Sequence, residues 1–215
     1  LVLSSGEGLS FNARIESAAL RGVTVTVMNE RPRRDAARTP VLAQALVKGE
    51  KLEWIIQKTV ELGLTHIIPF SSARTVPHYR GKDIEAKRKR WQTIALEAAT
   101  QSGLPFRPTI EAPLSWSELV ERFASFSPVI LFWEGEEHVS LKKLLARTKH
   151  AATAPLLIIG PEGGFAPQEI EEALQRGATT VSLGTQILRV ETAAVVATGI
   201  VLYERDNLEL PLATS

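Results

Sequence analysis

Residues 156–165 read LLIIGPEGGF, and residues 183–193 read LGTQILRVETA. In the first stretch an apolar run predicts a buried strand that stops at a glycine, a proline and two more glycines, after which a helical pattern begins at Pro167. The second stretch repeats this plan, because a short strand ends at Gly184 and a helix begins near Glu191 after a loop. Glycine lets main-chain amides approach a ligand closely, so two such turns at neighbouring strand ends predict a ligand pocket.

The glycine spacing argues against a nucleotide triphosphate site. It matches neither GxGxxG nor GxxxxGK[ST], and no Lys, Ser or Thr follows the glycines. Taken alone, GPEGG is equally typical of an ordinary strand-to-helix turn.

The rest of the chain alternates strands with helices from residue 41 onward, which predicts an α/β fold with a mostly parallel sheet covered on both faces. Before it, apolar alternation over 9–15 and a β-branched run over 23–27 predict two strands. A basic connector bounded by prolines, residues 30–40, marks a domain boundary. The predicted strands of the sheet cover 41–47, 66–70, 109–112, 128–133, 156–159 and 180–183, and the helices cover 52–62, 84–101, 116–123, 141–147, 167–176 and 191–204.

Composition narrows the class of protein. The 215 residues carry a net charge of +1 and no cysteine, so disulfides and thiolate metal sites are excluded. The four histidines lack metal-ligand spacing, and we expect no metal. No apolar run is long enough to span a bilayer and no secretion signal is apparent, so we expect a cytoplasmic protein that does not bind a membrane.

Charge is distributed unevenly. Residues 1–159 carry 22 Lys and Arg against 16 Asp and Glu, whereas residues 160–215 carry three against eight. A nucleic-acid surface is therefore expected in the first part of the chain, although charge runs of this kind are also typical of solvated surfaces. The candidate RNA-binding cations are Arg31, Arg33, Arg34, Lys48, Lys51, Lys58, Arg74, Lys87, Arg88 and Arg90.

The two glycine-containing stretches together resemble the RsmE-type 16S rRNA uridine N3-methyltransferases of the SPOUT class. Further blocks in the same order support the resemblance, which extends over residues 41–205: KGEKLEW (48–54), QKTVELG (57–63), IPF (68–70), ARTV (73–76) and EAATQSG (97–103). The sequence departs from the family pattern at Leu104, Gln186 and Val190.

The resemblance implies a fold that periodicity alone does not. Residues 1–36 would be the end of a partial N-terminal β-barrel of the PUA-like type plus a linker, and residues 37–215 a SPOUT domain with a C-terminal trefoil knot. The last strands and the C-terminal helix would form the knot by threading the loops near residues 132–134, 160–165 and 183–189, which also make the pocket. The helix over 191–204 would form a homodimer interface through Ala193, Ala194, Ala197, Ile200 and Val201.

The resemblance also implies the chemistry: S-adenosylmethionine would be the cofactor, and the methyl acceptor would be N3 of a specific uridine, number 1498 in the family's usual numbering, in the 16S rRNA of the small ribosomal subunit. A narrow apolar slot with backbone donors suits adenine. The implied cofactor-binding residues are Leu131, Phe132, Glu134, Gly160, Pro161, Glu162, Gly163, Gly164, Leu183, Gly184, Ile187, Leu188, Arg189, Thr192 and Ala193.

Three residues are candidates for catalysis. Loss of the uracil imino proton spreads negative charge onto two carbonyl oxygens, which Arg189 would stabilise. Arg189 itself stays charged, so the base would be Glu162, Glu191 or water. Alternatively, Arg189 forms an ion pair with either glutamate and shapes the loop.

Two other functions remain open: a knotted ribose 2′-O-methyltransferase, and a non-catalytic RNA-binding module of the same fold. Blocks 48–63 and 97–103 favour the uridine-N3 branch. Trp54 and Trp91 lie at helical spacing among apolar residues and are expected in the core rather than at a base-stacking surface.

Overall fold

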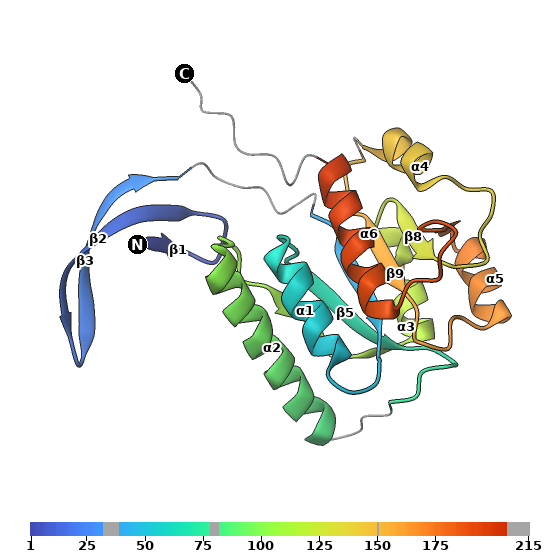
Figure 1. The fold of residues 1–215 in the computed structure, drawn as a ribbon, viewed down its shortest axis with the longest axis horizontal. Helices are drawn as coiled ribbons and strands as arrows, with labels where there is room; N and C mark the ends of the chain where they lie inside the picture. The colour runs from blue at the N-terminus through green and yellow to red at the C-terminus, as the bar shows by residue number, and fades with distance from the viewer. Residues whose placement is uncertain (32–38, 78–81, 150, 206–215) are drawn as a thin grey trace.

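The computed structural model describes residues 1–31, 39–77, 82–149 and 151–205. A small sheet at the N-terminus projects from a larger body in which helices cover a sheet (Figure 1). In chain order the elements are β1 (Val2–Ser4), β2 (Ser10–Ala19), β3 (Gly22–Glu30), β4 (Val41–Ala45), α1 (Lys51–Glu61), β5 (His66–Ser71), α2 (Lys82–Ser102), β6 (Thr109–Ile110), β7 (Leu114–Ser115), α3 (Trp116–Glu121), the 3₁₀ helix η1 (Phe123–Ser125), β8 (Val129–Phe132), α4 (Leu141–Thr148), β9 (Leu156–Ile159), α5 (Pro167–Gln175), β10 (Thr179–Val181) and α6 (Val190–Glu204).

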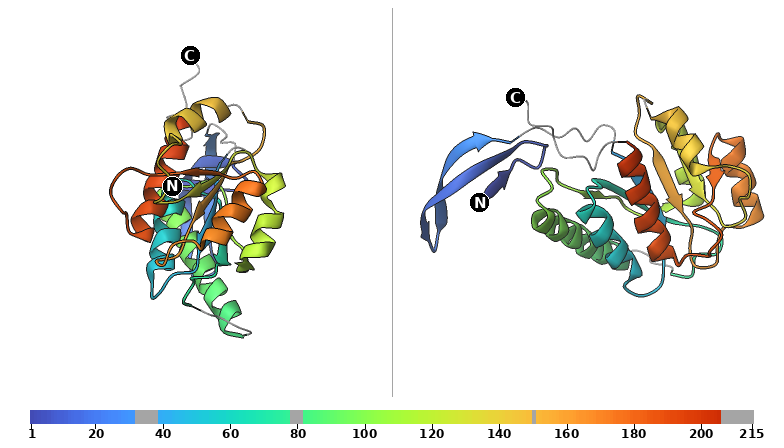
Figure 2. Two further views of the ribbon diagram at one scale, coloured as in Figure 1. Left: turned by 90° about the vertical axis from the view of Figure 1, so that its right-hand side faces the viewer. Right: turned by 45° about the horizontal axis from the view of Figure 1, so that its top comes forward.

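The large sheet has the order β10-β8-β9-β4-β5-β6, with β7 also paired to β5, and all its pairs are parallel. Its strands are buried on both faces, as parallel strands between helical layers require. Along β9, for example, Leu157 packs on the side of α1, α2, α4 and α6, whereas Ile158 packs on the side of α3 and α5. The end-on view in Figure 2 shows the sheet between these two layers.

The predicted alternation of strands and helices is confirmed, with differences at the ends of elements. The strand predicted over 180–183 ends at Val181, because the Ser182 hydroxyl bonds the backbone of Gly184 and turns the chain away. The helix predicted over 116–123 ends at Glu121 and continues as a 3₁₀ turn. Strands β1 and β7 were not predicted, since three and two residues are too short for a periodic signal.

The N-terminal strands form an open antiparallel sheet in the order β1-β2-β3. The turn between β1 and β2 contacts the segment that follows α2: the Gly8 amide donates to Pro105 O (3.0 Å) and the Arg107 amide donates to Gly6 O (2.9 Å). Beyond this contact the β2-β3 hairpin extends away from the body, with exposed apolar side chains that include Ile15 and Val23. Arg33 and Arg34 lie outside the described residues. None of the helices in the described ranges has the length and hydropathy needed to cross a bilayer.

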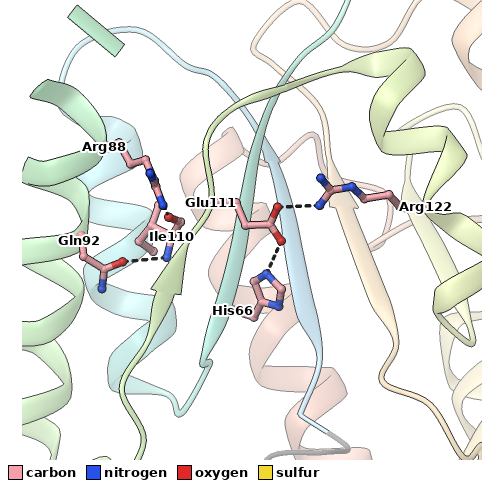
Figure 3. A network of polar contacts seen from close by, with 6 residues as sticks. All are labelled: His66, Arg88, Gln92, Ile110, Glu111 and Arg122. Carbon is pink, nitrogen blue, oxygen red and sulfur yellow. Dashed lines mark hydrogen bonds and ion pairs between the residues drawn. The ribbon is translucent and has the colours of Figure 1, made fainter. Parts of the chain in front are cut away.

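A side chain completes the edge of the large sheet at β6. The Gln92 amide accepts a hydrogen bond from the Ile110 amide (3.1 Å) and donates one to Pro108 O (2.7 Å). Arg88 Nε donates to Ile110 O (3.2 Å), as Figure 3 shows. Helix α2 therefore satisfies backbone groups of an edge strand that is only two residues long.

Glu111, directly after β6, links β5 to the region beyond α3. One carboxylate oxygen lies 2.6 Å from His66 Nε2, and the other accepts from Arg122 Nη1 at 2.6 Å (Figure 3). Burial raises the pKa of the Glu111 carboxyl, but the hydrogen bonds from Arg122 and His66 outweigh burial and hold this pKa below its usual value of 4.5. Ionised Glu111 is therefore part of the stable fold.

We expect Glu111→Gln to lower the free energy of unfolding in a pH-dependent way. Because the folded-state pKa of Glu111 is depressed, its stabilisation is fully present above 4.5 and is lost as the pH falls through the lower folded-state pKa. Urea unfolding of both proteins, followed by circular dichroism from neutral pH into the acid range, measures the difference. Glu121→Gln, on the exposed side of α3, is the control. A difference that persists unchanged at the lowest pH would contradict this assignment.

Candidate functional site

Three loops meet at one edge of the large sheet, where β8, β9 and β10 end. Since these strands are parallel neighbours, their carboxyl ends lie together, which is where open α/β sheets bind ligands. The loops enclose two adjoining hollows of about 120 Å³ each. The residues that line both hollows are Phe132, Glu134, Ile187, Leu188 and Ala193.

The loop after β9, residues 160–166, has a shape that requires glycine. A Cβ atom on Gly160 would lie 2.8 Å from the Phe165 ring, so that ring packs on a bare Cα. Gly164 has a φ of +68° and closes a tight turn by donating to Pro161 O (2.9 Å). Phe165 is buried and stacks on Phe70 at the end of β5, with ring centroids 6.5 Å apart. We call residues 160–166 the 160s loop.

Glu162 ties the 160s loop to the start of α1. Its carboxylate accepts from Lys51 Nζ (3.0 Å) and from the Lys48 amide (3.3 Å). Burial raises the pKa of the Glu162 carboxyl, but the hydrogen bond from Lys51 and those from backbone amides lower it below the usual range. Glu162 is thus an ionised, paired carboxylate.

The start of α6 separates the two hollows from a broader groove. Ile187, Leu188, Val190 and Ala193 line the hollows. Arg189, Glu191 and Thr192 line a groove of about 1100 Å³ between α1, α2 and α6. Residues 187–193 therefore form a wall between the hollows and the groove, with side chains on both sides of it.

Arg189 and Glu191 do not pair with each other. Arg189 is exposed, and within the described ranges neither Glu162 nor Glu191 forms an ion pair with it. The Glu191 Oε2 atom is buried and accepts no hydrogen bond from any described residue. The ion pair considered for Arg189 is therefore not observed.

The structure brings most of the predicted cofactor residues together. Phe132, Glu134, Gly160, Pro161, Glu162, Gly164, Leu183, Gly184, Ile187, Leu188 and Ala193 line the two hollows. Four others do not: Leu131 is buried in the core on the α3–α5 face, Gly163 lies against Arg74, and Arg189 and Thr192 line the groove.

Sequence reasoning missed several residues that line the hollows. They are Trp133, Ile159, Phe165, Ser182, Thr185, Gln186 and Val190. Each of these residues is adjacent in sequence to a predicted one, and this adjacency was the signal that could have identified it. Apart from Glu191, the acidic side chains that line the groove form no recognisable motif in the sequence, so they could not be identified from it.

Most of the predicted RNA-binding cations that the structure describes have partners within the protein. Lys58 pairs with Glu61, and Arg90 forms two 2.7 Å hydrogen bonds to Glu53. Lys51 binds Glu162, Arg88 binds Ile110 O, and Arg74 Nη1 donates to Gly163 O (3.0 Å). Lys87 is partly buried, and the side chains of Arg31 and Lys48 are exposed.

The two tryptophans expected in the core differ in burial. Trp91 is buried, as predicted, whereas Trp54 is 43% exposed and lines the groove. The prediction for Trp54 is wrong because α1 packs on the sheet through Leu52, Ile55 and Ile56, which leaves Trp54 on the opposite side of the helix.

Known proteins resemble this chain in sequence and in structure. An RNA methyltransferase domain family matches residues 36–202. A Bacillus subtilis protein named ribosomal RNA small subunit methyltransferase E is 31% identical over 212 residues, 97% of this chain and 83% of that protein. A Neisseria gonorrhoeae protein of the same name, solved bound to S-adenosyl methionine, is 26% identical with a TM-score of 0.80, over 94% of this chain and 82% of that one. A Legionella pneumophila putative methyltransferase in complex with the same cofactor is 28% identical with a TM-score of 0.74, over 94% and 81%.

We expect Gly160→Ala to destabilise the fold by about 1–3 kcal/mol, because the new methyl group overlaps the Phe165 ring. Urea unfolding midpoints measure this cost. In a Phe165→Leu background the same substitution should cost less, since Leu lacks the ring atoms Cε2 and Cζ that crowd the methyl. Gly22→Ala, where a Cβ meets nothing within 4 Å, is the control. Equal costs in both backgrounds would disprove the contact.

Proposed function

This chain belongs to the RNA methyltransferase domain family and to the ribosomal RNA small subunit methyltransferase E family, and from this we propose that it methylates N3 of a specific uridine of 16S rRNA, within the small ribosomal subunit, using S-adenosylmethionine. The observation that carries the proposal is the wall at the start of α6. It has a hollow for a cofactor on one side and a groove with Arg189 and Glu191 on the other.

The residues around the two hollows suit S-adenosylmethionine. Leu183, Ile187 and Leu188 offer apolar surface for adenine, and the main chain at Gly160 and Gly164 allows close approach to the ribose and methionine parts. When bound, this cofactor would supply a methyl group made electrophilic by its sulfonium centre.

Arg189 and Glu191 would act on the uracil. The exposed Arg189 guanidinium would stabilise the negative charge that spreads onto the carbonyl oxygens flanking N3. Glu191 lines the groove beside Arg189 and would accept the imino proton. Glu162 is less suited to this role, because its pairing with Lys51 lowers the pKa of its carboxyl.

The same family membership leads us to propose a SPOUT domain over residues 37–215 whose trefoil knot involves residues 132–134, 160–165 and 183–189. The meeting of these loops at the hollows is consistent with it. Residues 1–36 would be the end of a partial PUA-like β-barrel plus a linker, and the open sheet β1-β2-β3 would supply three of its strands.

We further propose a homodimer, through a side of α6 that shares only Ile200 with the face expected from the sequence. Ala194, Ala197 and Val201 are fully buried against the chain's own sheet and helices, so they are not available to a partner. Val196, Ile200 and Tyr203 instead form an exposed stripe along α6, with Trp54 exposed on the adjacent α1. Apolar side chains gathered in this way are typical of an interface.

The activity is tested by incubating the protein with S-adenosylmethionine and small ribosomal subunits, followed by mass spectrometry of the rRNA nucleosides. We expect 3-methyluridine from the wild type and a kcat lower by about a hundredfold or more for Arg189→Ala, the scale of losing one preorganised donor. Cofactor affinity and melting temperature of the variant should stay close to wild type. A 2′-O-methylated nucleoside, or no product, would contradict the proposal, and wild-type turnover in Arg189→Ala would contradict the role of Arg189.

Light scattering at micromolar concentration should give twice the monomer mass for the wild type. Ile200→Glu should shift this mass toward the monomer, because a buried unpaired carboxylate opposes association. Leu174→Glu, an equally charged change at an exposed apolar residue of α5, should leave the dimer intact. A monomeric wild type would refute the homodimer, and a dimeric Ile200→Glu would refute this interface.

A further inference from the structure

Glu169 is a buried carboxylate that joins two distant segments of the chain. It is only 6% exposed, and its two oxygens accept hydrogen bonds from the Ala73 amide and the Ala166 amide, both at 2.8 Å. No cation in the described ranges forms an ion pair with it. Both oxygens are thus held by backbone amides, and Glu169 lies in the first turn of α5, where an acidic residue is favoured.

The segment that Glu169 holds is the turn at Ser72–Thr75, directly after β5. The Ser72 amide donates to Thr75 Oγ1 (2.9 Å), the Thr75 amide donates to Ser72 O (3.1 Å), and the two hydroxyls lie 3.2 Å apart. Ser72 and Thr75 are both buried. The turn is thus closed by its own hydrogen bonds and presents Arg74 at the surface.

Arg74 reaches from this turn to the back of the 160s loop. Its Nη1 donates to Gly163 O (3.0 Å), and its Cβ would lie 3.2 Å from a Cβ on Gly163. Gly163 does not line the hollows, but Glu162 and Gly164 on either side of it do. Arg74 therefore fixes the middle of a loop whose neighbouring residues form the pocket wall.

We propose that Arg74 and Glu169 are positioning residues for the methyl-transfer reaction. Glu169 holds the Ser72–Thr75 turn and the start of α5 in register, and Arg74, acting through Gly163, holds the 160s loop in the shape that receives the cofactor. The inference rests on the proposed function, because it takes S-adenosylmethionine as the ligand of the hollows. It gives Arg74 a role in cofactor binding in place of the RNA contact that its charge suggests.

The test uses two pairs of variants. Glu169→Gln keeps one oxygen that can accept from one of the two amides and places an N–H₂ donor against the other, whereas Glu171→Gln removes the same charge from the exposed side of the same helix. Arg74→Ala removes the donor to Gly163, whereas Arg74→Lys keeps a donor. Lys89→Ala, an exposed cation of α2, controls for loss of positive charge.

We expect calorimetry to show a dissociation constant for S-adenosylmethionine that is about tenfold higher for Glu169→Gln and about threefold higher for Arg74→Ala, the scale of losing one or two hydrogen bonds. Glu171→Gln, Lys89→Ala and Arg74→Lys should remain within about twofold of wild type on the same reasoning. The KM for the cofactor should rise with kcat nearly unchanged, and the melting temperature of Arg74→Ala should not move, because Arg74 is exposed.

Wild-type cofactor affinity in Arg74→Ala would overturn the inference, even if Glu169→Gln failed to fold. So would a loss of RNA affinity alone, or equal losses in Glu169→Gln and Glu171→Gln. These outcomes leave the proposed function intact when the wild type binds the cofactor and methylates rRNA. A wild type that binds no S-adenosylmethionine would instead refute the proposed function.

Discussion

The packing of the Phe165 ring on the bare Cα of Gly160 is the contact on which the site depends. The ring also stacks on Phe70 at the end of β5, so one side chain connects the 160s loop to the core on the α3–α5 face of the sheet. With the ring in place, the chain must reverse within a few residues, and this reversal directs Glu162 toward Lys51 and the Gly163 carbonyl toward Arg74. The polar contacts of the 160s loop therefore depend on the apolar contact between Phe165 and Gly160.

The wall between the hollows and the groove has an equally simple origin. Arg189 precedes α6 in extended conformation, with φ of −62° and ψ of 151°. With the chain in this non-helical conformation, Leu188 lines the hollows while Arg189 lines the groove. A short loop can in this way serve two ligands, since neither needs a separate structural element.

Periodicity predicted the parallel sheet well because its strands are continuous apolar runs, and the glycine turns predicted which loops would meet. Side-chain direction could not be predicted. Leu131 and Phe132 are both apolar, yet only Phe132 lines the hollows. Which side chain of β8 lies on which face of the sheet is determined by the pairing of β8 with its neighbouring strands. Helix α6 is apolar on all sides, so the sequence could not distinguish the buried Val201 from the exposed Val196. Partners far apart in the chain, such as Lys51 and Glu162, also left no local signal.

The hydrogen bonds of the Gln92 side chain bear on aggregation of the protein in a crowded solution. An edge strand with unpaired N–H and C=O groups is a template onto which a strand of another molecule can add. At β6 the Gln92 side chain already bonds the Ile110 amide and the Pro108 carbonyl, and Arg88 bonds the Ile110 carbonyl. Helix α2 thus covers the hydrogen-bonding groups through which the large sheet could add a strand from another molecule.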